Sequence, residues 1–176
     1  GSTNANTKNT ENPWQEKLYR KKPIRKFVNL FMSKEGTKDY RKQKELLAAA
    51  KKAKDSGIID GIRLSTRPDY INLPIMENLK FYGVDTIELG VQSLDPTVLK
   101  LAKRGYEKEM VALASKLIKS FGMTLGHQLM VGLPGDTEEK DLLSALESIA
   151  MKPDLVRIYP ALVIRDTEME KAYLDG

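Results

Sequence analysis

A repeated alternation of strand and helix patterns constrains the fold of this chain most strongly. Apolar stretches typical of buried strands begin at residues 61, 86, 124 and 155, and the strand-to-strand spacing is roughly 25 to 38 residues. Each pair of strands is separated by at least one helical pattern, as in parallel βαβ units. The strands read as too apolar to leave a face in water, which favours a parallel sheet.

The ends of these elements carry recognisable signals. Helices are predicted over 40–57, 72–83, 95–105, 108–122 and 136–152, with a last helical piece from residue 166. Gly57, Gly83 and Gly122 follow helices, and Asp95 with Pro96 opens one. In the first helix an apolar stripe is expected at Leu46, Leu47, Ala50 and Ala53.

A further apolar run at 26–32 predicts an additional strand. Five strands are too few for a closed eight-stranded barrel, so we expect an α/β fold of the partial parallel (β/α) barrel type over 26–176. An incomplete barrel leaves a sheet edge open, and we expect the edge near 26–32 to favour self-association. Residues 1–25 are predicted to be a disordered or non-barrel arm.

The net charge of +5 has a local origin. A basic tract contains no acidic residue and carries Lys17, Arg20, Lys21, Lys22, Arg25 and Lys26. Such a tract contacts RNA phosphates in nucleic-acid-binding proteins, whereas the alternative is a solvated arm. The start of the chain lacks the apolar segment of a signal peptide, and no apolar run has the length of a membrane span. We therefore expect a cytoplasmic protein.

Polar side chains recur where the predicted strands end. These positions are Ser65, Thr66, Arg67 and Asp69; Glu88, Gly90, Gln92 and Ser93; His127 and Gln128; and Arg157 and Tyr159. In parallel α/β folds this edge of the sheet is where ligands bind. The sequence therefore predicts a pocket for a polar, charged small molecule, while no catalytic constellation or metal-ligand spacing is present.

Several of these residues have plain structural alternatives. Arg67 and Asp69 are close enough to form only a local ion pair. Glu88, flanked by apolar residues, is either functional or bridged to Arg63 or Arg157. The sole histidine, His127, is either a base or a side chain satisfied at the end of its strand.

Four segments in this order and spacing carry a specific resemblance: "GIRLSTRPDYI", "YGVDTIELGVQSLDPTVLKLAKRG", "LGHQLMVGLPGDTEEKD" and "KPDLVRIYPALVIRDTEME". They resemble the radical S-adenosylmethionine (SAM) superfamily. Within it, they are similar to the Elongator catalytic subunit and the oxygen-independent coproporphyrinogen oxidase-like iron–sulfur proteins. The resemblance runs from about residue 40 to residue 176.

The resemblance implies a partial six-stranded barrel with oxidoreductase chemistry in tRNA modification. Members hold a [4Fe–4S] cluster on three cysteines and cleave SAM to a radical. It also implies that Arg67, Gln92, Arg104 and Gln128 contact SAM and that Gly132 and Gly135 approach its adenine. Gln128 stands where relatives often have an acidic residue.

Two departures limit what the resemblance transfers. The chain has no cysteine, so it cannot bind the cluster through thiolates, and "VNLFMSKEG" lacks the paired glycines that hold the SAM amino group. We therefore expect a truncated or degenerate radical SAM barrel, without catalytic residues for radical chemistry and with weakened SAM affinity. One alternative is a non-catalytic RNA- or protein-binding module. Another is an enzyme of a different class that uses His127, Glu88 or Asp136 in the same pocket.

Overall fold

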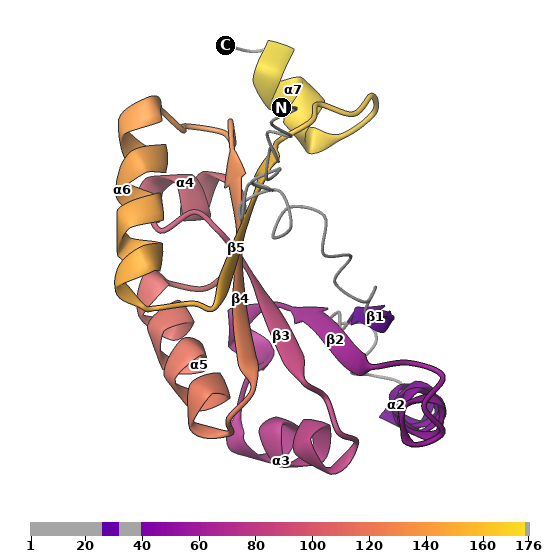
Figure 1. Ribbon diagram of the computed structural model, residues 1–176. Helices are drawn as coiled ribbons and strands as arrows, with labels where there is room; N and C mark the ends of the chain where they lie inside the picture. Colours follow the sequence, from indigo (N-terminus) through magenta and orange to yellow (C-terminus); the bar gives the residue numbers. More distant parts are fainter. Residues whose placement is uncertain (1–25, 32–39, 175–176) are drawn as a thin grey trace, which may run out of the picture.

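The computed structural model describes residues 26–31 and 40–174. In this part of the chain, five parallel strands form one sheet in the order β1-β2-β3-β4-β5, which curls into a half-barrel (Figure 1). The predicted partial (β/α) barrel is therefore confirmed. The strands are β1 (Phe27–Phe31), β2 (Gly61–Thr66), β3 (Thr86–Gln92), β4 (Thr124–Val131) and β5 (Leu155–Pro160).

The connecting segments are mostly helical. They are α2 (Tyr40–Asp55), the 3-10 turn η1 (Pro68–Tyr70), α3 (Leu73–Phe81), α4 (Pro96–Leu101), α5 (Lys108–Ser120), α6 (Glu138–Ala150) and α7 (Glu168–Leu174). The helix predicted over 95–105 is shorter than expected. The predicted arm at 1–25 lies outside the described residues. No helix among the described residues combines the length and apolarity that a membrane crossing requires.

Side-chain caps fix where these helices begin. The side chain of Asn72 accepts a 3.0 Å hydrogen bond from the Ile75 amide, and that of Asp95 accepts one of 2.9 Å from the Val98 amide. Each bond satisfies an amide that has no partner within its helix. The βα junctions, where polar strand ends meet helix starts, are thereby held in place.

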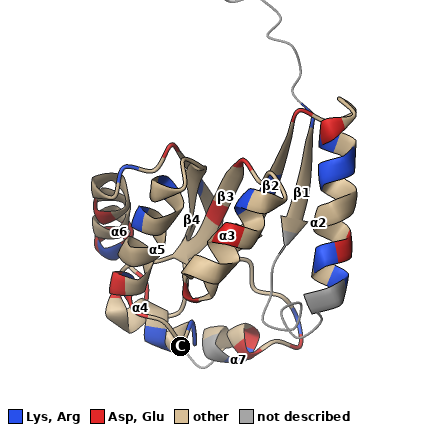
Figure 2. Ribbon diagram, turned by 90° about the horizontal axis from the view of Figure 1, so that it is seen from below, with Lys and Arg blue, Asp and Glu red and all other residues tan. Residues whose placement is uncertain are grey.

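The two faces of the sheet differ in chemistry. One face packs against the helices, which Figure 2 shows arranged around the outside of the sheet. It is formed by buried apolar side chains of the core, namely Ile62, Leu64, Ile87, Leu89, Val91, Leu125 and Leu129. Successive side chains of a strand alternate between faces, so the intervening residues point away from the helices.

We call this second surface the polar face. It comprises Arg63, Ser65, Glu88, Gly90, Gly126, Gln128, Arg157 and Tyr159. The strand register aligns its members across the sheet, with Ser65 opposite Glu88 and Gln128 opposite both Gly90 and Arg157. Four neighbouring strands therefore supply polar groups to one surface, which runs from the third residue of each strand toward its carboxyl end.

Two regions differ from the sequence prediction. The strands were expected to be covered on both faces, but in β5 Val156 is 41% and Ile158 61% exposed. The stripe predicted for α2 holds for Leu47 and Ala50, which are buried, whereas Leu46 is 52% exposed. The apolar pattern therefore predicted correctly which segments are strands and which are helices. It did not predict which of their apolar side chains are buried.

Helix α6 presents its apolar residues outward. Leu142, Leu146 and Ile149 are each more than half exposed, while Ser144 and Ser148 are buried against the sheet. The Ser144 hydroxyl accepts a 3.0 Å hydrogen bond from the Leu94 amide, so the buried serine is satisfied. Polar side chains with partners therefore take the inner face of this helix.

Candidate functional site

The centre of the polar face is the buried carboxylate of Glu88, which is 2% exposed. Its Oε1 lies 3.3 Å from Arg63 Nη1 and 3.2 Å from Arg157 Nη2. Its Oε2 accepts a 2.7 Å hydrogen bond from Gln128 Nε2. The sequence left open whether Glu88 pairs with Arg63 or Arg157, and the structure shows that it pairs with both.

These four side chains come from four consecutive strands of the curled sheet, β2 to β5. Gly126 makes the approach possible, because a Cβ atom there would lie 2.8 Å from Glu88 Cγ. Arg157 also donates a 3.5 Å hydrogen bond from Nη1 to the Tyr159 hydroxyl, so Tyr159 joins the cluster. That hydrogen bond first, and the Glu88 charge second, raise the pKa of Arg157 above its usual value.

Arg67 lies just beyond the end of β2 and is held by protein groups. Its Nε and Nη2 each donate 2.9 Å hydrogen bonds to Asp69, and Nη2 also donates to the Arg104 carbonyl. The hydrogen bond to Asp69 is the main reason that the pKa of Arg67 is raised. The local ion pair considered from the sequence is therefore present.

The end of β3 gathers further polar groups around Gly90. A Cβ atom at Gly90 would lie 3.0 Å from Gln92 Nε2 and 3.8 Å from Arg104 Nη2, so both side chains reach this position. Gln128 is the register partner of Gly90 on β4. Because Arg67 bonds to the Arg104 carbonyl, the four residues implied by the resemblance to contact SAM lie around one end of β3.

The backbone at this point is irregular. The β3–β4 register shifts between Gly90 and Gln92, and Gln92 has a φ of 64°, in the left-handed region. Non-glycine residues in that region are uncommon and cost about 1 kcal/mol or more. A strained strand end that carries a polar side chain is a frequent feature of ligand sites.

Tyr106 was not singled out from the sequence. Its hydroxyl donates a 2.7 Å hydrogen bond to the Gly90 carbonyl, and its ring lies under Arg67, whose guanidinium carbon is 5.3 Å from the ring centroid. Burial raises the pKa of the phenol above its usual value, although Arg104 opposes the shift. A tyrosine two residues after Arg104 carries no signal in the sequence that would reveal this contact.

The glycine-rich turn after β4 is held mainly by its own side chains. The Gly132 amide donates a 3.2 Å hydrogen bond to Asp136 Oδ2, and Thr137 caps α6. Gly135, with a φ of 76°, lies against Leu101 of α4. The approach of Gly132 and Gly135 to an adenine therefore stays a prediction.

His127 lies on the opposite face of the sheet. It is fully buried between α5 and α6, with Nε2 2.9 Å from the Ser115 hydroxyl and Nδ1 2.8 Å from that of Ser148. Burial lowers its pKa to about 4. The hypothesis that His127 and Glu88 share one pocket is therefore wrong, because alternation within β4 turns His127 toward the helices.

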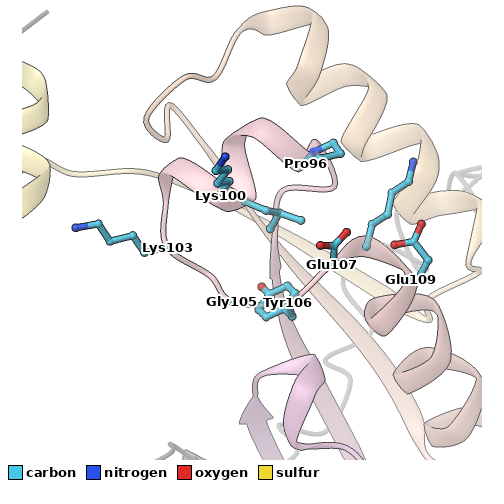
Figure 3. A pocket seen from close by; sticks show the side chains of 9 residues that line it. Pro96, Lys100, Lys103, Gly105, Tyr106, Glu107 and Glu109 are labelled. Atoms are coloured by element: carbon cyan, nitrogen blue, oxygen red, sulfur yellow. The ribbon is translucent and has the colours of Figure 1, made fainter.

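A cavity of about 650 Å³ lies apart from the polar face, where α4 meets α5 (Figure 3). Lys100 and Lys103 line it on the α4 side, and Glu107 and Glu109 line it on the α5 side. Lys108 also lines it, so three lysines and two glutamates surround the cavity and charges of both signs are mixed in its lining. The Tyr106 ring forms part of its wall and connects it to the end of β3.

Comparison with known families identifies this arrangement. The model of the radical SAM superfamily matches residues 11–146. This chain belongs to the radical SAM superfamily. The tRNA uridine(34) acetyltransferase of Methanocaldococcus infernus is 37% identical over 116 residues, and human Elongator complex protein 3 is 32% identical over 119 residues. These matches place the chain in the Elongator-like branch.

The chain covers only part of these relatives. It spans 22% of the length of each of the two proteins, which in turn match 64% and 66% of this chain. A solved structure of the archaeal Elp3 from M. infernus superposes with a TM-score of 0.72 at 28% identity, covering 86% of this chain and 41% of that one. The coproporphyrinogen III oxidase HemN of Escherichia coli, at TM-score 0.60 and 18% identity, supports the fold alone.

The residues of this radical SAM chain do not fit an iron–sulfur cluster. The sequence contains no cysteine, and no group of three or more His, Asp or Glu side chains among the described residues is placed to hold a metal ion. Around Gly90, amide and guanidinium groups of Gln92, Arg104 and Gln128 gather, and such groups can form hydrogen bonds with a polar ligand.

Proposed function

We propose that this chain is the SAM-binding half-barrel of an Elongator-type tRNA-modifying protein and does not itself perform radical chemistry. The gathering of Gln92, Arg104 and Gln128 around Gly90 is the observation that carries the proposal. Its inactivity rests on the absence of cysteine. The relatives named tRNA uridine(34) acetyltransferase support a role in tRNA modification, and with that role we propose a cytoplasmic location.

The side chains around Gly90 suggest how SAM would bind. Gln92 and Gln128 offer amide donors and acceptors for hydroxyl or carboxylate groups, and the missing side chain at Gly90 lets the Gln92 amide lie close to the strand. In the superfamily, the cluster chelates the amino and carboxylate groups of SAM. This chain lacks that anchor, so we expect weak binding.

Isothermal titration calorimetry with SAM tests this proposal. We expect saturable binding that Gln92→Ala weakens by about 5-fold or more, since a lost hydrogen bond to a buried ligand group is worth about 1 kcal/mol. Gln43→Ala, on α2 and distant from β3, is the matched control and should bind SAM normally. Absence of saturable binding, or equal binding by the two variants, would contradict the proposal.

A non-catalytic RNA-binding module is the second proposal. The basic tract Lys17, Arg20, Lys21, Lys22, Arg25 and Lys26 supports it, together with relatives whose names specify tRNA. All of the tract except Lys26 lies outside the described residues. Reversal of charge at Lys21, Lys22 and Arg25 should abolish tRNA binding in fluorescence anisotropy. Binding of tRNA without SAM would favour this module over the first proposal.

Self-association through the open sheet edge is proposed from the position of β1. This strand pairs only with β2 among the described residues, so its other side is an edge. The order of the sheet also leaves β5 as an edge. Light scattering at increasing concentration should show dimers or larger species, and a monomer throughout would argue against the proposal.

A further inference from the structure

We infer that Arg63 and Arg157 form a binding site on the polar face for an anionic group, a carboxylate or a phosphate. The SAM proposal leaves both residues unused, so the two ideas stand on different side chains. The site would lie over Glu88, where the two guanidinium groups converge from β2 and β5. Three observations carry the inference: net charge, accessibility and unused donors.

The charge of the cluster is unbalanced. Two guanidinium groups meet one carboxylate, and Gln128, which completes the contacts of Glu88, is neutral. One positive charge is therefore left over on the polar face among the described residues. Charges that are partly withdrawn from water interact more strongly than those at the surface, so a second anion is favoured there.

Accessibility separates the roles of the three charged groups. The side chain of Glu88 is 2% exposed, whereas those of Arg63 and Arg157 are 23% and 41% exposed. An incoming ligand therefore meets guanidinium groups and not the carboxylate. Glu88 acts as a positioning residue, because it fixes both guanidinium groups from beneath.

Both arginines retain hydrogen-bond donors. A guanidinium has five N–H groups. Arg63 directs Nη1 at Glu88, and its guanidinium carbon lies 5.2 Å from the centroid of the Phe27 ring. Its Nε has no hydrogen-bond partner among the described residues but is buried, so the Nη groups are the donors that a ligand would meet. Arg157 directs Nη2 at Glu88, and its contact with the Tyr159 hydroxyl is long at 3.5 Å. An anion with two or three oxygens matches the fork geometry of such groups.

The curl of the sheet explains why these residues meet. Arg63 and Arg157 lie on strands separated by β3 and β4, yet both reach the same oxygen of Glu88. Ligands of (β/α) barrels bind at the carboxyl ends of the strands, and the polar face continues from this cluster toward that end through Gly90 and Tyr159.

NMR titration of the full chain with inorganic phosphate and, separately, with acetate tests the inference. Ionic strength is held constant with sodium chloride, and the arginine Nε–H signals are followed. We expect saturable shifts of the Arg63 and Arg157 signals with at least one anion. Saturation by phosphate alone, acetate alone or both identifies the preferred group and supports the site. No saturable shift with either anion would overturn it.

Matched variants separate a built site from general charge attraction. Arg157→Gln should weaken binding about 10-fold or more, and Arg157→Lys should fall between this variant and the unmodified chain because it keeps the charge without the fork. Arg165→Gln changes the net charge equally at an exposed position outside the polar face and should bind normally. Equal affinities for Arg157→Gln and Arg165→Gln would overturn the site. SAM calorimetry on Gln92→Ala reports on the first proposal independently.

Discussion

Gln128 Nε2 donates a 2.7 Å hydrogen bond to Glu88 Oε2 and so joins β4 to β3 at the centre of the polar face. The bond requires an amide on one strand and an acceptor on the other. An amide at 128 adds no charge, so the two arginines remain the charged partners of Glu88. The identity of residue 128 therefore sets the charge balance of the whole cluster.

The first prediction concerns Gln128→Glu. Residue 128 contacts Glu88 Oε2, whereas both arginines contact Oε1, so a carboxylate at 128 would meet the carboxylate of Glu88 and not the guanidinium groups. The two carboxylates would share a proton more easily than they would both ionise, which raises a folded-state pKa. A carboxyl pKa raised on folding gives stability that is lost as pH rises. We expect a loss of about 1–3 kcal/mol at pH 7 and a smaller loss at pH 5.

Urea unfolding followed by circular dichroism at both pH values measures this effect. Gln43→Glu, on α2, adds the same charge away from the polar face and should change stability little. A variant of Gln128 that is as stable as the unmodified chain at pH 7 would mean that the arginines compensate a second carboxylate fully.

The second prediction concerns Gly126→Ala. The added Cβ would lie 2.8 Å from Glu88 Cγ and 2.7 Å from Leu155 Cδ1, so both neighbours must move. We expect a loss of about 1–3 kcal/mol, as for overpacked cores. At Gly57 the space is open and only the φ of 75° opposes a side chain, so Gly57→Ala should cost about 1 kcal/mol. Thermal unfolding that ranks these two variants in the reverse order would contradict the packing at Gly126.

The sequence was sufficient to predict the fold because its strongest pattern is local. Apolar runs, the Asp95–Pro96 helix start and glycines after helices indicate elements one at a time, and their alternation requires a parallel sheet. The sequence could give the contacts of Glu88 only as two alternatives, Arg63 or Arg157. The apolar residues around Glu88 indicate that it is buried, but they do not indicate which arginine contacts it. That both arginines meet one oxygen depends on the curl of the sheet.

Other features depend on contacts that a sequence pattern does not encode. The strand position of His127 was clear, but its face was not, because two polar residues, His127 and Gln128, are adjacent in "GHQL" and only one of them can point toward the polar face. Tyr106 lies in the loop between α4 and α5, and it contacts Gly90 only because the tertiary packing brings this loop against the end of β3. In helix α6 the leucines are exposed and the buried face holds serines, an arrangement that hydrophobic periodicity does not indicate.

The third prediction compares two leucines in different settings. Leu125 of β4 is fully buried, whereas Leu146 of α6 is 55% exposed. Leu125→Ala should cost about 2–5 kcal/mol through lost burial and a cavity, and Leu146→Ala should change stability by less than about 0.5 kcal/mol. Chemical denaturation of both variants measures the difference. A large cost at Leu146 would show that the outer face of α6 is covered in solution.

The last prediction is a pH dependence that originates at His127. Its pKa is lowered on folding from 6.5 to about 4 because burial disfavours the charged imidazole. Between these values the unfolded chain binds more protons than the folded chain, so stability rises with pH. The contribution is complete above about pH 6.5 and is lost as pH falls toward 4, with a total of about 3 kcal/mol.

The chain contains one histidine, so its imidazole signals in an NMR titration report directly on this pKa. The carboxyl group of Asp141 complicates stability curves, because burial and then the Asp136 carboxyl raise its pKa to about 6, and this effect has the opposite sign. The difference between the unmodified chain and His127→Gln cancels that contribution, and it should shrink as pH falls from 6.5 to 4. An imidazole that titrates near 6.5 in the folded chain would show that water reaches the space between α5 and α6.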